Sequence, residues 1–100
     1  MARVVISPLA ESQIGECRAF YEEGAIGIRA VKSILSAFKP LAGFPGMGRP
    51  LQEDPSLREL VIPFGHYGYV ALYTFTPATD TVTILAVRHQ RQSGYHHDFE

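Results

Sequence analysis

The chain has 100 residues, of which 46% are hydrophobic and 19% charged, and its net charge at pH 7 is −1. A chain of this length forms a single domain, here residues 1–100, and its composition excludes a disordered protein. The near-zero net charge argues against a protein that holds nucleic acid by neutralising many phosphates.

The first predicted strand is a short β-branched run at residues 3–6. A helix should follow, because the Ser7 side chain can cap free backbone N–H groups and Pro8 is tolerated at the first helical position. Apolar residues then recur at helical spacing: Leu9, Ala10, Ile14, Cys17, Phe20 and Tyr21. Gly24 is expected to end this helix.

A second amphipathic helix is predicted directly after Gly24. Its buried face comprises Val31, Ile34, Leu35, Phe38 and Leu41, and its outer face carries Arg29, Lys32 and Lys39. Pro40 should make its last turn irregular, up to about Ala42. Because the link around Gly24 is short, the two helices should be antiparallel neighbours.

The second half of the chain predicts a sheet. Residues 44–55 are rich in Gly and Pro and are expected to form a loop. Three strands at 57–62, 69–76 and 81–88 follow with short turns between them, which is typical of an antiparallel meander. The helical hairpin can bury its apolar stripe on this sheet. The predicted fold class is therefore α+β, in the order β-α-α-β-β-β.

The last strand is apolar on both sides and should be central in the sheet. Strict alternation places Val82, Ile84 and Ala86 on one side, and Leu85 and Val87 on the other. A dense group of cations and rings comes directly after it: Arg88, His89, Arg91, Tyr95, His96 and His97. The strand therefore delivers a polar cluster to a surface.

Three segments together resemble the RelE/ParE superfamily of bacterial toxins, also called plasmid stabilisation proteins. They are PGMGRPL at residues 45–51, LRELVI at 57–62 and ILAVRHQRQSGY at 84–95. The resemblance implies a toxin of a type II toxin–antitoxin module that causes growth arrest. It also implies a cognate antitoxin as protein partner, which a two-helix hairpin on a sheet with an open strand edge could accommodate.

The resemblance leaves two activities open. In the ParE-like branch the toxin inhibits DNA gyrase by protein contact, with Arg88, His89, Arg91 and Tyr95 as target-binding residues and no catalytic residue. In the RelE-like branch it is an endoribonuclease that cleaves mRNA on the ribosome. Arg58, His89, Arg91 and Tyr95 would then be catalytic, because the reaction needs proton transfer and stabilisation of phosphate charge. An inactive binding relative is a third hypothesis.

The residues themselves favour the gyrase inhibitor. A protein that grips RNA inside the ribosome should be strongly basic, whereas this chain is nearly neutral. Arg58 and Glu59 are neighbours on one strand and should point to opposite faces, so both cannot line one site without a bulge. Whether the chain is an enzyme therefore stays open.

Other site classes are less favoured by the sequence. No histidine or cysteine spacing matches a structural zinc site, so we expect no metal and no cofactor. The glycines at 46 and 48 are interpreted as a turn in which Arg49 pairs with a sheet or loop group. A single cysteine, Cys17, and the lack of a long apolar run favour a cytoplasmic protein without membrane contact.

Overall fold

The computed structural model describes residues 1–91. Two helices, five strands and two 3-10 turns form this part of the chain. In order they are β1 (Arg3–Ile6), α1 (Pro8–Ala19), α2 (Gly24–Phe38), a 3-10 turn (Lys39–Ala42), β2 (Arg49–Pro50), β3 (Leu57–Ile62), β4 (Tyr69–Thr76), a 3-10 turn (Pro77–Thr79) and β5 (Thr81–His89). The α+β class and the predicted order are confirmed, and β2 is an additional short strand within the expected loop.

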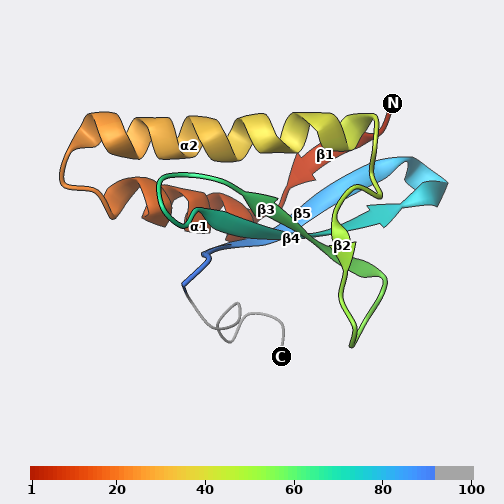
Figure 1. Ribbon diagram of the computed structural model, residues 1–100. Helices are drawn as coiled ribbons and strands as arrows, with labels where there is room; N and C mark the ends of the chain where they lie inside the picture. The colour runs from red at the N-terminus through yellow and green to blue at the C-terminus, as the bar shows by residue number, and fades with distance from the viewer. Residues whose placement is uncertain (92–100) are drawn as a thin grey trace.

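The five strands form one mixed sheet in the order β1-β5-β4-β3-β2. β3, β4 and β5 make the predicted antiparallel meander, while β1 pairs with β5 in parallel, from Arg3 opposite Thr81 to Ile6 opposite Ile84. The apolar strand β5 is thus central, as its sequence predicted. Both helices lie side by side on one face of this sheet (Figure 1). We call the other face, which carries neither helix, the open face, although its residues Val70, Leu72 and Ala86 are buried.

Local sequence explains how the helical layer is built. α1 begins at Pro8, where the Ser7 hydroxyl accepts a hydrogen bond from the Ala10 N–H at 3.1 Å. Gly27 of α2 is buried against α1, because a Cβ there would lie 2.5 Å from the Arg18 carbonyl oxygen. This glycine therefore lets the two helices approach closely. Neither helix within residues 1–91 is long and apolar enough to cross a bilayer.

The core lies between the helices and the sheet. Its fully buried large side chains come from α2, the turn after it and the strands: Ile34, Leu41, Ile62, Tyr73, Val82 and Ile84. Burial of such side chains contributes roughly 1.5–3 kcal/mol each relative to exposure. The stability of this small domain therefore depends on packing of both helices and the turn after α2 on the sheet.

Several helix expectations are wrong in detail. α1 ends at Ala19, and Gly24 is the first residue of α2 rather than the end of α1. Phe20 follows the last turn of α1 and is 76% exposed, so it does not widen the apolar stripe. Leu35 is 40% exposed because the buried line of α2 runs through Ala30, Ile34 and Phe38 instead.

A β-bulge changes the facing of residues in the second half of β5. Tyr73 pairs with Ile84 and the preceding Leu72 pairs with Ala86, so Leu85 is the extra residue. Val82, Ile84 and Val87 consequently belong to the core on the helix side, whereas Ala86 lies on the open face. The expected alternation is therefore wrong after Ile84. The bulge also moves the next polar residue, Arg88, to the open face.

Candidate functional site

The end of β5 presents two of the predicted site residues on opposite faces of the sheet. Arg88 pairs with Val70 and His89 pairs with Tyr69, which is a core residue on the helix side. Without the bulge at Leu85, the side chain of Arg88 would share the core face with Ile84. The bulge is therefore what allows a guanidinium at this position.

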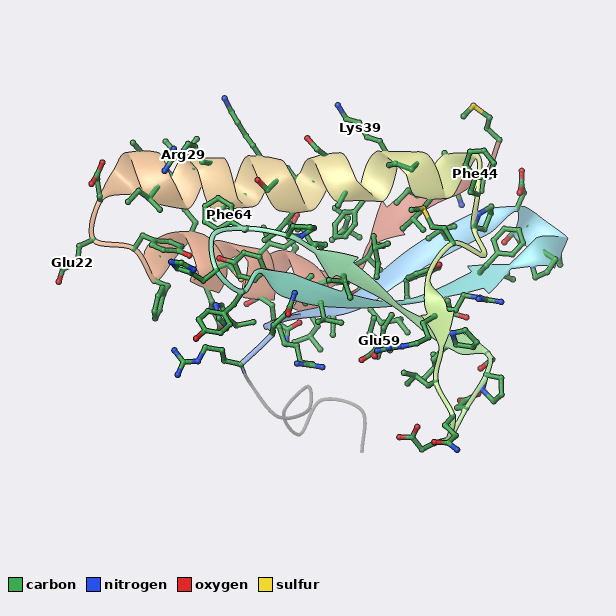
Figure 2. The ribbon with its side chains drawn as sticks, viewed as in Figure 1. Glu22, Arg29, Lys39, Phe44, Glu59 and Phe64 are labelled. Atoms are coloured by element: carbon green, nitrogen blue, oxygen red, sulfur yellow. The ribbon has the colours of Figure 1, made fainter. Side chains whose placement is uncertain are left out.

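Arg88 belongs to an ionic cluster on the open face that is centred on Glu59. Nη2 of Arg88 lies 3.7 Å from Oε2 of Glu59, and Oε1 of Glu59 lies 3.6 Å from Nη2 of Arg49. Nη1 of Arg88 also donates to the backbone carbonyls of His89 and Gln90, at 3.3 and 3.5 Å. Figure 2 shows Glu59 on the side of the sheet away from the helices. The predicted pairing of Arg49 with a sheet residue is confirmed.

A hollow with a volume of about 480 Å³ adjoins this ionic cluster. It is lined by Arg49, Pro50, Leu51, Gln52, Glu53, Glu59 and Arg88. Two arginines and two glutamates balance one another there, so the hollow is polar without being strongly basic. Such a lining fits a peptide surface better than a run of phosphates.

His89, Arg91 and Tyr67 form a second group beside the end of β5. The backbone N–H of Arg91 donates to Nδ1 of His89 at 3.1 Å, so Nδ1 is the hydrogen-bond acceptor of this ring. The Arg91 guanidinium lies over the Tyr67 ring at 4.9 Å, and the Tyr67 and His89 ring centroids are 6.0 Å apart. Tyr67 is 51% exposed, and Arg91 is exposed as well. This group combines a cation with accessible rings.

Tyr67 is a candidate site residue that the sequence did not single out, because the segment between the strands at 57–62 and 69–76 is predicted only as a turn. A signal was present. An antiparallel pairing of β4 with β5 places the residues before β4 next to those after β5, and the Gln90 N–H indeed donates to the Gly68 carbonyl at 3.0 Å. The exposed aromatic in this turn could therefore have been assigned to the polar cluster.

Arg58 is not part of either group. It pairs with Tyr73 on the helix side of the sheet, and its Nη1 donates to the carbonyls of Gly48 at 2.7 Å and Gly46 at 3.1 Å. Arg58 and Arg88 therefore lie on opposite faces. His89 pairs with Tyr69, which lies four residues before Tyr73 on β4. The pairing positions of Arg58 and His89 are therefore roughly 13 Å apart along the strand.

The remaining predicted residues lie outside the described part of the chain. These are Tyr95, His96 and His97. Within residues 1–91, no three His, Cys, Asp or Glu side chains come close enough to hold a metal ion. The expected separation of Arg58 from Glu59 holds, because Arg58 contacts the glycine loop while Glu59 contacts Arg88.

A series of ring contacts continues from His89 to the helices. His89 contacts Tyr69 edge-on at 5.5 Å, Tyr69 contacts Phe64 at 6.1 Å, and Phe64 contacts Tyr21 at 6.1 Å. The hydroxyl oxygens of Tyr21 and Tyr69 are 3.3 Å apart. Burial, together with this hydrogen bond, raises the pKa of Tyr69 far above its ordinary value, so it is not a ready proton donor. Figure 2 shows Phe64 on the helix side.

A second hollow, of about 610 Å³, opens between α2, the end of α1 and the β3–β4 loop. Its lining is Tyr21, Ile26, Arg29, Lys32, Ser33, Phe64 and Gly65. Cations and aromatic rings thus lie together at the surface around both this hollow and the end of β5.

The model of the family described as the ParE toxin of the type II toxin–antitoxin system parDE matches residues 4–94. A relative named Toxin RelE3, from Caulobacter vibrioides, is 33% identical over 91 residues, which cover 89% of this chain and 95% of the relative.

Two solved structures share the fold. One, from a chromosomal ParDE system of P. aeruginosa, has a TM-score of 0.74 at 20% identity and covers 89% of this chain and 96% of its own. The other, from the toxin–antitoxin complex RelBE2 of Mycobacterium tuberculosis, has a TM-score of 0.65 at 23% identity and covers 88% and 96%. Since the family model spans nearly the whole sequence, the chain belongs to the ParE toxin family of type II toxin–antitoxin systems, within the RelE/ParE superfamily.

Proposed function

We propose that this toxin inhibits DNA gyrase by protein contact, in the bacterial cytoplasm, and that a cognate antitoxin neutralises it. The antitoxin partner is supported by the family and by the two solved neighbours, both of which come from toxin–antitoxin systems. As in other plasmid stabilisation modules, loss of the antitoxin would release the toxin and arrest growth.

The separation of Arg58 from His89 carries the proposal for a non-enzymatic toxin. Cleavage of RNA needs a base, an acid and cations that converge on one phosphate. Arg58 instead holds the glycine loop, and its pairing position on β4 is roughly 13 Å of strand away from that of His89. Among the described residues, Arg58 and His89 therefore do not converge on the same phosphate.

The proposed target-binding surface runs around the end of β5, with Tyr67, His89 and Arg91 on one side and Arg88 on the open face, and it includes Tyr95 beyond the described residues. Tyrosine and arginine are the residues most often found at the energetic centre of protein interfaces. Tyr67 and Arg91 support one another in this role, because the guanidinium stacks on an exposed ring at 4.9 Å. A nearly neutral protein can bind another protein with such anchors.

A specific observation also favours a second candidate, an mRNA endoribonuclease that acts with the ribosome. The Arg91 backbone N–H bonds the His89 ring, which keeps these two residues together, and imidazole and guanidinium groups suit proton transfer and phosphate binding. The relative at 33% identity is named Toxin RelE3. In this alternative, His89 and Arg91 would act with Tyr95, and Arg58 would support the fold instead of the reaction.

The test is a supercoiling assay with purified gyrase, relaxed plasmid and ATP, with and without the antitoxin. We expect linear or nicked DNA that the antitoxin suppresses, and a loss of about tenfold or more in potency for Arg91→Ala and Tyr67→Ala, as for interface hot spots. Lys39→Ala, which removes an exposed cation after α2, is the matched control. Figure 2 shows Lys39 pointing away from the sheet.

The alternatives give different results. Unchanged supercoiling, together with discrete cleavage of translated messages in arrested cells, would replace gyrase inhibition with RNA cleavage. Folded protein that binds the antitoxin but neither affects gyrase nor arrests growth would identify an inactive relative. If the Arg91→Ala variant inhibits gyrase as strongly as wild type, the proposed target-binding surface is wrong.

A further inference from the structure

The glycine-rich loop before β2 is fastened to the helix side of the sheet by side chains of β3 and β4. The buried Tyr73 hydroxyl donates to the Pro45 carbonyl at 2.7 Å and accepts from the Gly48 N–H at 2.8 Å. Arg58 adds its two hydrogen bonds to the carbonyls of Gly46 and Gly48. The loop is therefore held through a backbone N–H donor and through backbone carbonyl acceptors.

Gly48 is required by this attachment. A Cβ at this position would lie 2.6 Å from the Tyr73 hydroxyl oxygen and 2.7 Å from the Glu59 carbonyl oxygen. Contacts of that length to a buried ring and to backbone cannot be relieved by a small side-chain movement. Only glycine lets the loop approach the sheet closely enough for the Tyr73 hydrogen bonds to form.

The next residue, Arg49, projects to the cluster on the open face. Arg49 pairs with Glu59 in the two-residue strand β2, and its guanidinium lies 3.6 Å from the Glu59 carboxylate. The Arg49 side chain is 78% exposed, whereas those of Glu59 and Arg88 are 13% and 17% exposed. An exposed arginine samples many rotamers, so its backbone must be fixed if it is to stay beside one carboxylate.

We propose that Tyr73, Arg58 and Gly48 form a latch that positions Arg49 and, through Glu59, fixes the guanidinium of Arg88 on the open face. The latch and the ion pairs that it positions lie on opposite faces of the sheet and are connected by the Gly48–Arg49 backbone. This inference rests on the proposed function in one respect, because Arg88 belongs to the proposed target-binding surface. Tyr73 and Arg58 are then positioning residues, and neither needs to touch the target.

The position of Arg88 explains why such a device is useful. Its guanidinium is largely buried and contacts one carboxylate, and Glu59 can align it only if Glu59 is itself held. Arg49 supplies the second cation on Glu59, which keeps the carboxylate between two guanidinium groups. Fixing one rotamer-rich side chain before binding removes about 0.5–1.5 kcal/mol of ordering cost, or about a twofold to tenfold gain in affinity.

The test uses Tyr73→Phe, which keeps the ring and removes only the hydroxyl. Thr81→Val is the matched control, since it also removes one hydroxyl, whose hydrogen bond goes to the neighbouring Thr79 carbonyl at the opposite end of β5 from Arg88. We expect Tyr73→Phe to weaken gyrase inhibition about fivefold to tenfold, with antitoxin affinity unchanged. Both variants are first compared with wild type by circular dichroism.

A double variant separates positioning from a general loss of stability. If Tyr73 acts through Arg49, then Arg49→Ala and the pair Tyr73→Phe with Arg49→Ala should inhibit gyrase equally weakly, although their losses of unfolding free energy add. If the double variant instead loses inhibition by the product of the two single-variant losses, the proposal is overturned. Full inhibition by Tyr73→Phe would overturn it as well.

A second measurement does not depend on any target. The Nε–Hε resonance of Arg88 in an ¹⁵N NMR spectrum should shift in Tyr73→Phe and in Arg49→Ala, and stay in place in Thr81→Val. An unchanged Arg88 resonance in Tyr73→Phe would overturn the latch. If wild-type protein leaves gyrase unaffected while the resonance shifts as expected, the latch stands and the gyrase proposal fails.

Discussion

The carboxylate of Glu59 lies 3.7 Å from the guanidinium of Arg88, and the two side chains keep only 13% and 17% of their exposure. They belong to different strands, β3 and β5, with β4 between them. The pair therefore spans three strands of the open face. It exists because the bulge at Leu85 turns Arg88 away from the helices.

Neutralising Glu59 should destabilise the protein more than removing its exposed partner. In Glu59→Gln, a largely buried Arg88 keeps its charge without a carboxylate, and we expect the free energy of unfolding to fall by about 1–3 kcal/mol. Arg49→Ala removes a pair that is largely in water and should cost less than about 1 kcal/mol. Urea unfolding at pH 7 measures both values. Equal losses would show that the Glu59–Arg88 pair is not the stabilising half of the cluster.

Replacing Gly48 with alanine should destabilise the fold, because the new Cβ would meet Tyr73 and the Glu59 backbone at 2.6 and 2.7 Å. Overpacking of this kind costs typically about 1–3 kcal/mol. Gly15 is the matched control, since it lies within α1 and a Cβ there has no neighbour within 4 Å. Gly15→Ala should raise the unfolding free energy by roughly 0.5–1 kcal/mol. Thermal unfolding that ranks the two variants in the reverse order would contradict this account of the loop.

Much of the fold could be predicted because its signals are local. The Ser7-Pro8 start of α1, the apolar period of α2 and the turns between the last three strands each come from adjacent residues. The opposite facing of Arg58 and Glu59 followed from the two-residue period of a strand, and the structure confirms it. The pairing of Arg49 with a sheet residue was also confirmed.

The parts that could not be predicted depend on contacts between distant segments. β5 is apolar on both faces, so its sequence carries no sign of the bulge at Leu85 that decides the facing of Arg88. The parallel pairing of β1 with β5 joins residues almost 80 positions apart. A glutamine such as Gln13 would be expected on the exposed side of a helix. Gln13 is buried instead, because its side chain has a hydrogen-bond partner on β5.

Gln13 should contribute to stability through a hydrogen bond that β1 cannot supply. β1 ends at Ile6, opposite Ile84, whereas β5 continues, and Oε1 of Gln13 accepts from the Val87 N–H at 2.8 Å. Gln13→Leu keeps the bulk but leaves this buried donor unsatisfied, so we expect a loss of about 1–3 kcal/mol. Ser12→Ala, one residue away on the exposed side of α1, should change stability by less than about 0.5 kcal/mol. Urea unfolding of the two variants and faster amide exchange at Val87 provide the check.

Cys17 should be a slow nucleophile at neutral pH. Burial, with a smaller contribution from Glu16, raises the pKa of its thiol from 9.0 to about 11. The thiolate fraction at pH 8 should then be about 100-fold lower than that of a free cysteine, because each pKa unit changes it tenfold. Alkylation of the folded protein by iodoacetamide should accelerate beyond pH 9 and level off only near pH 11, whereas the urea-unfolded chain should level off near pH 9.

The same shift gives a pH dependence of stability with a definite sign. Above pH 9 the unfolded chain releases the Cys17 proton while the folded protein keeps it, so the folded state binds more protons. The free energy of unfolding must therefore fall as the pH rises from 9 toward about 11. Burial also raises the pKa of Tyr73, and its contribution has the same sign. Cys17→Ala removes only the thiol contribution and should make the decline shallower, as urea midpoints between pH 8 and 11 would measure. An identical decline in Cys17→Ala would mean that the tyrosines alone cause it.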